Sequence, residues 1–227
     1  LPAPKLKLSV MNIENIFDDI SFKVSPKDDY RSSYKFRFIK SFYKIFKKEK
    51  NYVFDNCIIN KEKIDLDLRK ELIKIDSMST YAIGYLINRI CKNLSKNQVY
   101  LNIGCWKGFS LVAGMINTQC KVIGVDNFSQ FTGPKNDFIK NFENSKKSNH
   151  FFFEQDYEKY FGSLDHTKDK FDFYFYDGEH SYDNQFKNLE IADNFLNVGS
   201  LVLIDDINFD EVYEGTLDFI NKTKSKY

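Results

Sequence analysis

The chain has 227 residues, and its 33 Lys and Arg against 32 Asp and Glu leave a formal net charge of +1. This length suits one α/β domain with an extension and is short for two large domains. The balanced charge gives no general argument for nucleic-acid binding. No stretch approaches the ~20 apolar residues that cross a bilayer, and residues 1–10 lack the apolar core of a signal peptide.

The cysteines are not arranged for metal binding. They form no C-x-x-C pair and have no histidine at zinc-ligand spacing: Cys57, Cys91, Cys105 and Cys120. Reduced thiols in this pattern are typical of a cytoplasmic protein, which is the location we predict.

Residues 1–77 are predicted to be an N-terminal arm followed by a helical extension. Residues 1–30 are polar and carry three of the four prolines, which favours an arm with little structure of its own. Residues 32–50 predict a helix with an aromatic face and a basic face. Three hypotheses stay open for it: packing on the core, an oligomer interface, or binding to an anionic membrane or nucleic acid. Further elements are predicted before the apolar run at 99–111: a strand at 52–59 and helices at 64–75 and 79–94 that cover a ligand site.

The main domain, residues 78–227, contains an apolar run that stops at a glycine, VYLNIGCWKGFSL at 99–111. The pattern predicts a strand, a tight loop from Gly104 to Gly108 and a helix at 109–116. Such a loop lets a ligand approach the backbone. Trp106 and Phe109 stand where a dinucleotide fingerprint has glycine, which disfavours a pyrophosphate. Taken alone, two glycines also fit a turn without any ligand.

Four later apolar runs each end in an acid: KVIGVD at Asp126, HFFFEQD at Asp156, FDFYFYD at Asp177, and SLVLIDD at Asp205 and Asp206. Strands that alternate with helices predict an α/β fold with a doubly wound, mostly parallel sheet and helices on both faces. Ligands of such sheets bind at the carboxyl ends of the strands, where all these acids lie. Helices are predicted within 127–149, at 185–196 with Gly199 marking the end, and at 211–222.

In this order, LNIGCWKGFS, VIGVD, EQD, YDGEHSYD and LVLIDD resemble class I S-adenosylmethionine-dependent methyltransferases. Within that class the chain is most similar to the small-molecule O-methyltransferase group related to macrocin O-methyltransferase and cephalosporin hydroxylase. The resemblance implies a Rossmann-like sheet and S-adenosylmethionine as the cofactor, with Asp126 at the ribose and Asp156 at the adenine. The predicted cofactor site comprises Asn102, Gly104, Cys105, Trp106, Gly108, Ser110, Asp126, Asn127, Asp156, Tyr157 and Asp177.

The chain departs from the class I pattern in two places. Asn102 stands where an acid is common; its amide can accept a hydrogen bond from the ligand's ammonium side but brings no charge. The usual final pair of strands has no counterpart after Lys222. These departures keep a non-catalytic S-adenosylmethionine-binding relative open as an alternative.

Methyl transfer to a hydroxyl requires aligned reactants and removal of the acceptor proton. Asp177, Asp205 and Asp206 end adjacent predicted strands, and a divalent cation, Mg²⁺ above all, would relieve their repulsion. The resemblance also implies Mg²⁺ at the matching acids. In the alternative interpretation, Asp206 caps a loop and Asp177 contacts only the cofactor. His180 is the predicted general base, and Asp177 is the second catalytic candidate. In the alternative interpretation, His180 caps the helix that follows it.

The predicted function is therefore O-methylation of a small hydroxylated metabolite or sugar. An NAD-dependent oxidoreductase is a further alternative. Nucleic acid is not expected as a partner, and a homo-oligomer is compatible with the sequence.

Overall fold

The computed structural model describes residues 16, 20–22, 57–59 and 65–223. The helix predicted at 32–50 and most of the predicted arm lie outside these residues. Two short strands, β1 (Ile20–Phe22) and β2 (Cys57–Ile59), pair antiparallel, and β2 falls within the strand predicted at 52–59. Across the described ranges, no helix has the length and apolar character that a membrane crossing requires.

Five parallel strands form the main sheet in the order β5-β4-β3-β6-β7. Their bounds are β3 (Val99–Ile103), β4 (Lys121–Asp126), β5 (His150–Glu154), β6 (Phe171–Tyr176) and β7 (Leu196–Ile204). The strand order changes direction at β3, since β4 lies on one side of it and β6 on the other. Ligands of doubly wound sheets bind at such a point. The predicted fold class is confirmed.

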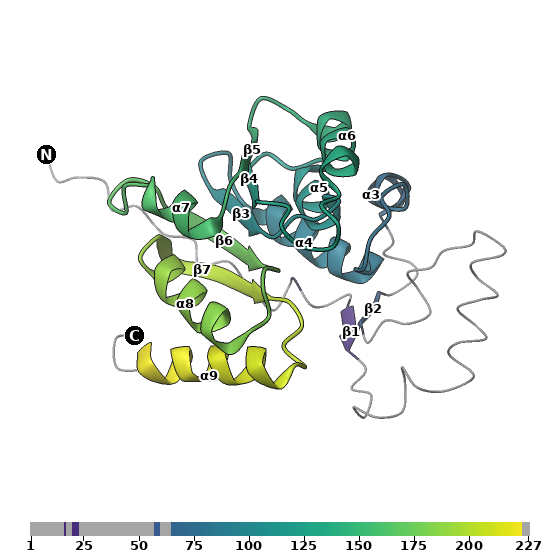
Figure 1. Cartoon of the computed structure of the whole chain (residues 1–227). Helices are drawn as coiled ribbons and strands as arrows, with labels where there is room; N and C mark the ends of the chain where they lie inside the picture. The colour runs from purple at the N-terminus through teal and green to yellow at the C-terminus, as the bar shows by residue number, and fades with distance from the viewer. Residues whose placement is uncertain (1–15, 17–19, 23–56, 60–64, 224–227) are drawn as a thin grey trace, which may run out of the picture.

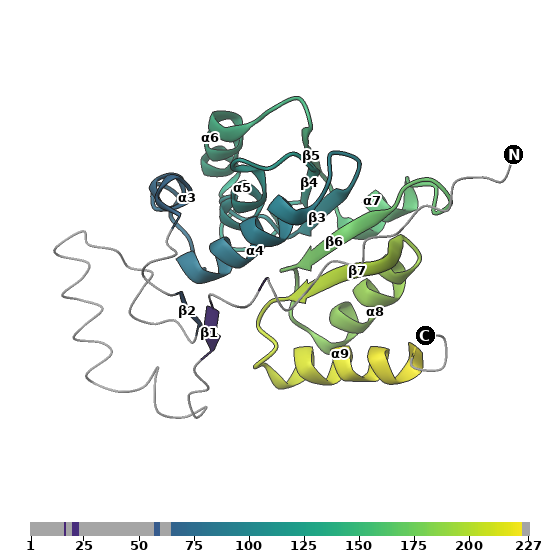
Figure 2. The same cartoon turned by 180° about the vertical axis from the view of Figure 1, so that it is seen from behind.

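Helices cover both faces of this sheet (Figures 1 and 2). Their bounds are α3 (Leu66–Leu72), α4 (Tyr81–Asn93), α5 (Phe109–Met115), α6 (Lys135–Ser145), α7 (Tyr157–Gly162), α8 (Tyr182–Asp193) and α9 (Asp210–Thr223). Successive strand residues point to opposite faces. Tyr100 accordingly packs in the apolar cluster beneath α4 and α5, while Leu101 packs with the residues of α7 and α8.

Helix α4 belongs to the core and does not form a cover over the site. The Thr80 side chain caps its start by accepting from the Ile83 amide at 3.4 Å. Asn88, almost fully buried, donates through Nδ2 to the carbonyls of Ala113 and Ile116. These bonds attach α4 to the end of α5. Among the described residues before β3, the site pocket is lined by Met78 alone.

The prediction that Gly199 ends a helix is wrong. Helix α8 stops at Asp193, and β7 starts three residues later because Leu196 already pairs with Phe171 of β6. Gly199 has a φ of +81° and lies inside β7, beside a shift in the pairing register. Local periodicity could not separate these elements, since strand pairing with β6 decides where β7 begins.

The buried His150, at the start of β5, is expected to lower the free energy of unfolding at acidic pH. Its side chain is buried, and burial, followed by the charge of Lys147, lowers the pKa of its imidazole to about 4. The unfolded chain, with a His pKa of about 6.5, therefore binds more protons between these values, so stability falls as the pH drops through this window. We expect His150 to account for a loss of about 2 kcal/mol between pH 7 and pH 4.5.

Urea denaturation at several pH values measures this effect. His150→Gln should flatten the pH dependence, whereas His166→Gln, which alters an exposed histidine, should leave it unchanged. An identical slope in wild type and His150→Gln would contradict the assignment.

Candidate functional site

The loop after β3 sits directly against the end of β6. Gly104 has a φ of +80°, and a Cβ built on it would lie 1.9 Å from the carbonyl oxygen of Asp177. Gly108, with a φ of +94°, begins α5. Glycine is required at Gly104 by both the backbone conformation and the close approach. The loop predicted from the sequence is therefore present, and its first glycine is essential for packing.

Asp126, at the end of β4, holds this loop in place. Its Oδ2 accepts from the amides of Cys105 (2.7 Å) and Trp106 (2.8 Å), and its Oδ1 accepts from the Phe128 amide (2.6 Å). A carboxylate has about four acceptor positions. The two ribose hydroxyls assigned to Asp126 from the sequence therefore compete for about one remaining position.

Four of the predicted cofactor contacts do not line the pocket: Asn102, Cys105, Gly108 and Ser110. Asn102 is fully buried; its Oδ1 accepts from Ser110 Oγ at 2.8 Å, and its Nδ2 donates to the Gly104 carbonyl at 3.0 Å. Cys105 points its Sγ to the carbonyls of Asn102 and Val125. In the structure, the side chains of Asn102, Cys105 and Ser110 support the loop from behind, whereas the sequence predicted that they contact the cofactor.

Asn102→Asp is expected to destabilise the protein, although an acid is common at this position in the resembling class. The substitution removes the Nδ2 donor and places a carboxylate oxygen against the Gly104 carbonyl in a fully buried position. We expect a loss of about 2–4 kcal/mol. Thermal and urea denaturation measure it, with Ser110→Ala as the milder control, which loses one hydrogen bond worth about 1 kcal/mol. Unchanged stability in Asn102→Asp would refute the supporting role.

A pocket opens where β3, β4 and β6 end. Seven predicted residues line it: Gly104, Trp106, Asp126, Asn127, Asp156, Tyr157 and Asp177. Sequence reasoning missed other lining residues, among them Met78, Phe131, Glu179 and Asn184. Glu179 follows Asp177 by two residues, so the strand-end rule could have included it. Met78 and Phe131 lie in segments without a recognisable motif.

Among the described residues, the charged side chains that line this pocket are all acidic. Five acids line it: Asp126, Asp156, Glu158, Asp177 and Glu179. Within the described part of the chain, no Lys or Arg contributes to the lining. Lys107, which follows Trp106 in the loop, instead bonds Asp76 at 2.8 Å and lies over the Trp106 ring. A cationic ligand is therefore favoured over an anionic one.

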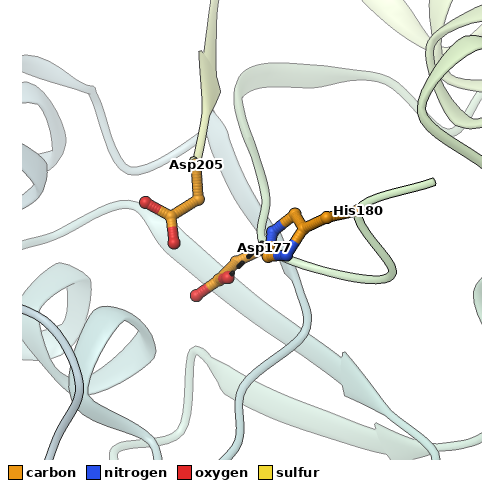
Figure 3. Close-up of side chains that lie close together, drawn as sticks. All are labelled: Asp177, His180 and Asp205. Carbon is orange, nitrogen blue, oxygen red and sulfur yellow. Dashed lines mark ion pairs between the residues drawn. The ribbon is translucent and has the colours of Figure 1, made fainter. Parts of the chain in front are cut away.

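Beside the pocket, Asp177, His180 and Asp205 bring one ligand atom each to within 4.8 Å of one another. Figure 3 shows the two carboxylates at the ends of neighbouring strands and the imidazole approaching from the loop after β6. The predicted metal set had Asp206 in place of His180. In the structure, the three-residue cluster contains His180, and the Oδ2 of Asp206 lies 3.9 Å from His180 Nδ1. A left-handed φ of +48° at Asp206 turns the chain after Asp205.

The negative charges of this cluster favour the binding of a proton or a cation. Burial first, and then the negative charge of Asp205, raise the pKa of the Asp177 carboxyl well above its usual range. His180 Nε2 lies 3.7 Å from Asp177 Oδ1 and is buried without a hydrogen-bond partner among the described residues. Carboxylate oxygens and an imidazole nitrogen are common ligands of divalent cations, so the donor set fits a metal ion.

Comparison with known proteins agrees with this geometry. Residues 101–207 match a family described as "Methyltransferase domain". This part of the chain is therefore similar to methyltransferase domains. The match and the fold confirm the resemblance to class I S-adenosylmethionine-dependent methyltransferases. A search of curated proteins found no match.

Several solved structures share the fold of this chain. A Podospora anserina methyltransferase bound to S-adenosylhomocysteine has 15% identity and a TM-score of 0.54, over 90% of this chain and 91% of that one. An O-methyltransferase from Bacillus cereus in complex with S-adenosylhomocysteine has 14% identity and a TM-score of 0.52, over 71% and 80%. TomG, a Streptomyces achromogenes O-methyltransferase with bound S-adenosylmethionine, has 14% identity and a TM-score of 0.51, over 72% and 79%.

Proposed function

We propose that this chain is a methyltransferase, which transfers the methyl group of S-adenosylmethionine to a hydroxyl oxygen of a small molecule. The acidic pocket at the strand ends is the observation that carries this proposal. The ligand has a positively charged sulfonium and an ammonium group, and both are favoured beside carboxylates. NAD, the cofactor of the alternative oxidoreductase, would bring two phosphates into a pocket whose described lining has five acids and no Lys or Arg. The O-methyltransferases among the structural neighbours support the choice of a hydroxyl acceptor.

The lining residues suggest how the cofactor lies. Asp126, at the end of β4, accepts from the Trp106 amide in the loop after β3, while Asp156 and Tyr157 are at the start of α7. We assign the first pair to the ribose and methionine portions and the second pair to the adenine. Tyr157 is held by its hydroxyl, which donates to Asn184 Oδ1 at 3.3 Å. The carboxylate of Asp156 caps α7 through Oδ1. Its Oδ2 accepts from Asn127 Nδ2 at 3.5 Å and has a further acceptor position for a ligand amino group.

We assign the proton-handling groups to the cluster beside the pocket. A divalent cation bound there by Asp177, His180 and Asp205 would lower the pKa of the acceptor hydroxyl. Because one ligand is an imidazole, the set suits Mn²⁺ or another transition-metal ion at least as well as the predicted Mg²⁺. For the case without a cation, we assign the acceptor proton to Nε2 of His180, which has no hydrogen-bond partner among the described residues.

Calorimetric titration tests the cofactor assignment. S-adenosylmethionine, S-adenosylhomocysteine and NAD are titrated separately, each with and without Mg²⁺ or Mn²⁺. We expect S-adenosylmethionine and S-adenosylhomocysteine to bind, and we expect no binding of NAD. Glu179→Gln should weaken the binding of S-adenosylmethionine, which carries the sulfonium charge, more than the binding of S-adenosylhomocysteine, whose sulfur is neutral. Glu143→Gln, which alters an exposed acid on α6 outside the pocket, is the matched control.

The outcomes separate the competing functions. NAD binding without either methyl-cycle ligand would establish the oxidoreductase alternative and overturn the proposal. Cofactor binding without methyl transfer to any hydroxylated acceptor in a broad screen would favour the non-catalytic relative. The small hydroxylated acceptor and the cytoplasmic location stay predictions from the sequence.

A further inference from the structure

The indole nitrogen of Trp106 is a polar group in the wall of the pocket. Trp106 is one of the lining residues, and its Nε1 is buried with no hydrogen-bond acceptor among the described residues. An indole N–H can only donate. A buried donor without an acceptor costs stability, and native structures keep few of them. The wall of the pocket therefore contains a donor that an acceptor atom of a ligand can satisfy.

The backbone and the ring of Trp106 are both held in place. Its φ of +45° is unusual for a bulky residue, and Asp126 Oδ2 accepts from its amide at 2.8 Å. Lys107 Nζ lies 4.7 Å from the centroid of the indole ring. This ammonium group is itself fixed between two carboxylates, 2.8 Å from Asp76 Oδ2 and 3.4 Å from Asp137 Oδ2. Backbone strain that is maintained at the wall of a pocket points to a function.

The backbone amides of the loop after β3 donate within the chain. Glycine-rich loops commonly bind anionic groups through free amides. Here the Gly104 amide donates to the Val125 carbonyl at 3.0 Å, and the Gly108 amide donates to the Cys105 carbonyl at 2.7 Å. The amides of Cys105 and Trp106 both donate to Asp126 Oδ2. These amides are therefore not available to an anionic group of a ligand, whereas the indole N–H is.

S-adenosylmethionine has one anionic group, the carboxylate of its methionine portion. The described lining of the pocket has five acids and no Lys or Arg, so no cationic side chain there attracts this carboxylate. A hydrogen bond from an N–H to a carboxylate is charge-assisted and stronger than a neutral one. The loop also touches the end of β6, since a Cβ on Gly104 would lie 1.9 Å from the Asp177 carbonyl oxygen. Asp177 lines the pocket at this contact, and its carboxylate suits the ammonium of the same methionine portion.

We propose that Trp106 Nε1 donates a hydrogen bond to the carboxylate of the methionine portion of S-adenosylmethionine. This inference rests on the proposed function, because it takes S-adenosylmethionine as the ligand of the pocket. It gives a neutral side chain the role that loop amides or a basic residue would otherwise have. The lining acids repel the carboxylate, and the indole N–H offsets that repulsion. Without this donor, the pocket should discriminate against a cofactor that carries a carboxylate.

Calorimetric titration of the full chain with two ligands tests the hydrogen bond. S-adenosylmethionine and decarboxylated S-adenosylmethionine share the adenosine, the sulfonium and the ammonium, and only the first has the carboxylate. Trp106→Phe keeps an aromatic ring and removes the N–H. It should weaken the binding of S-adenosylmethionine about tenfold or more and that of the decarboxylated ligand less than about threefold. Tyr157→Phe, which removes a hydroxyl from the lining at the proposed adenine end, is the matched control and should change both affinities by the same factor.

Nuclear magnetic resonance observes the same hydrogen bond in the wild type. The chain has a single Trp, so one indole N–H signal reports on Trp106 without further assignment. A hydrogen bond to a carboxylate moves the signal of the donated proton downfield. S-adenosylmethionine should cause this shift, and decarboxylated S-adenosylmethionine should not. This measurement decides the matter even where Trp106→Phe does not fold.

The outcomes distinguish this inference from the proposed function. If both ligands bind the wild type and Trp106→Phe weakens them equally, the inference is wrong and the cofactor assignment stands. The same holds if both ligands bind and the indole signal does not move downfield with S-adenosylmethionine. Failure of both ligands to bind the wild type would overturn the proposed function and this inference with it.

Discussion

Gly104→Ala is expected to abolish cofactor binding and to destabilise the fold by roughly 3 kcal/mol or more. A Cβ at this position would lie 1.9 Å from the Asp177 carbonyl oxygen and 2.5 Å from its carbonyl carbon. Both atoms are backbone, so no side-chain rotation can relieve the clash. The φ of +80° adds strain for any residue with a Cβ. The ends of β3 and β6 must therefore separate, and these ends carry the pocket.

Urea denaturation and titration with S-adenosylhomocysteine measure the two effects of Gly104→Ala. Gly162→Ala is the matched control, because a Cβ on Gly162 meets no atom within 4 Å. It should change stability by less than about 1 kcal/mol in either direction. Wild-type stability and binding in Gly104→Ala would mean that the loop does not pack against β6 as described.

Asp177→Asn is expected to eliminate methyl transfer while it stabilises the protein. Asp177 lines the pocket and belongs to the cluster with His180 and Asp205. Its pKa is raised by burial first and by the charge of Asp205 second, so the ionised carboxylate is unfavourable when no cation is bound. Asparagine removes that charge at similar size. We expect a loss of at least about 10³-fold in turnover and a gain of about 0.5–2 kcal/mol in the cation-free protein.

Thermal unfolding with and without Mn²⁺ separates these effects. The wild type should gain stability when Mn²⁺ is added. Without the ion, Asp177→Asn should be more stable than the wild type, and Mn²⁺ should not change its stability. Asp206→Asn is the informative control, because Asp206 belongs to the cation set predicted from the sequence but not to the cluster in the structure. A larger loss of Mn²⁺ stabilisation in Asp206→Asn than in Asp205→Asn would favour the set predicted from the sequence.

The layer architecture, and the edge of the sheet on which the site lies, can be predicted from residue order alone. Apolar runs of strand length, alternating with helical patterns, specify a parallel sheet because crossovers between parallel strands need a helix and have one hand. The acids Asp126, Asp156 and Asp177 directly follow such runs. Their place at the carboxyl ends therefore follows from chain order alone, and all three line the pocket.

Which side chains face the pocket depends on contacts that form only in the folded chain. Asn102 precedes Gly104 by two residues, yet it points into the core, because Ser110 of α5 and the Gly104 carbonyl satisfy its amide there. His180, and not Asp206, joins the acid cluster because the left-handed turn at Asp206 redirects the chain after Asp205. Such directions depend on partners distant in sequence and on the path of a loop, and residue order encodes neither.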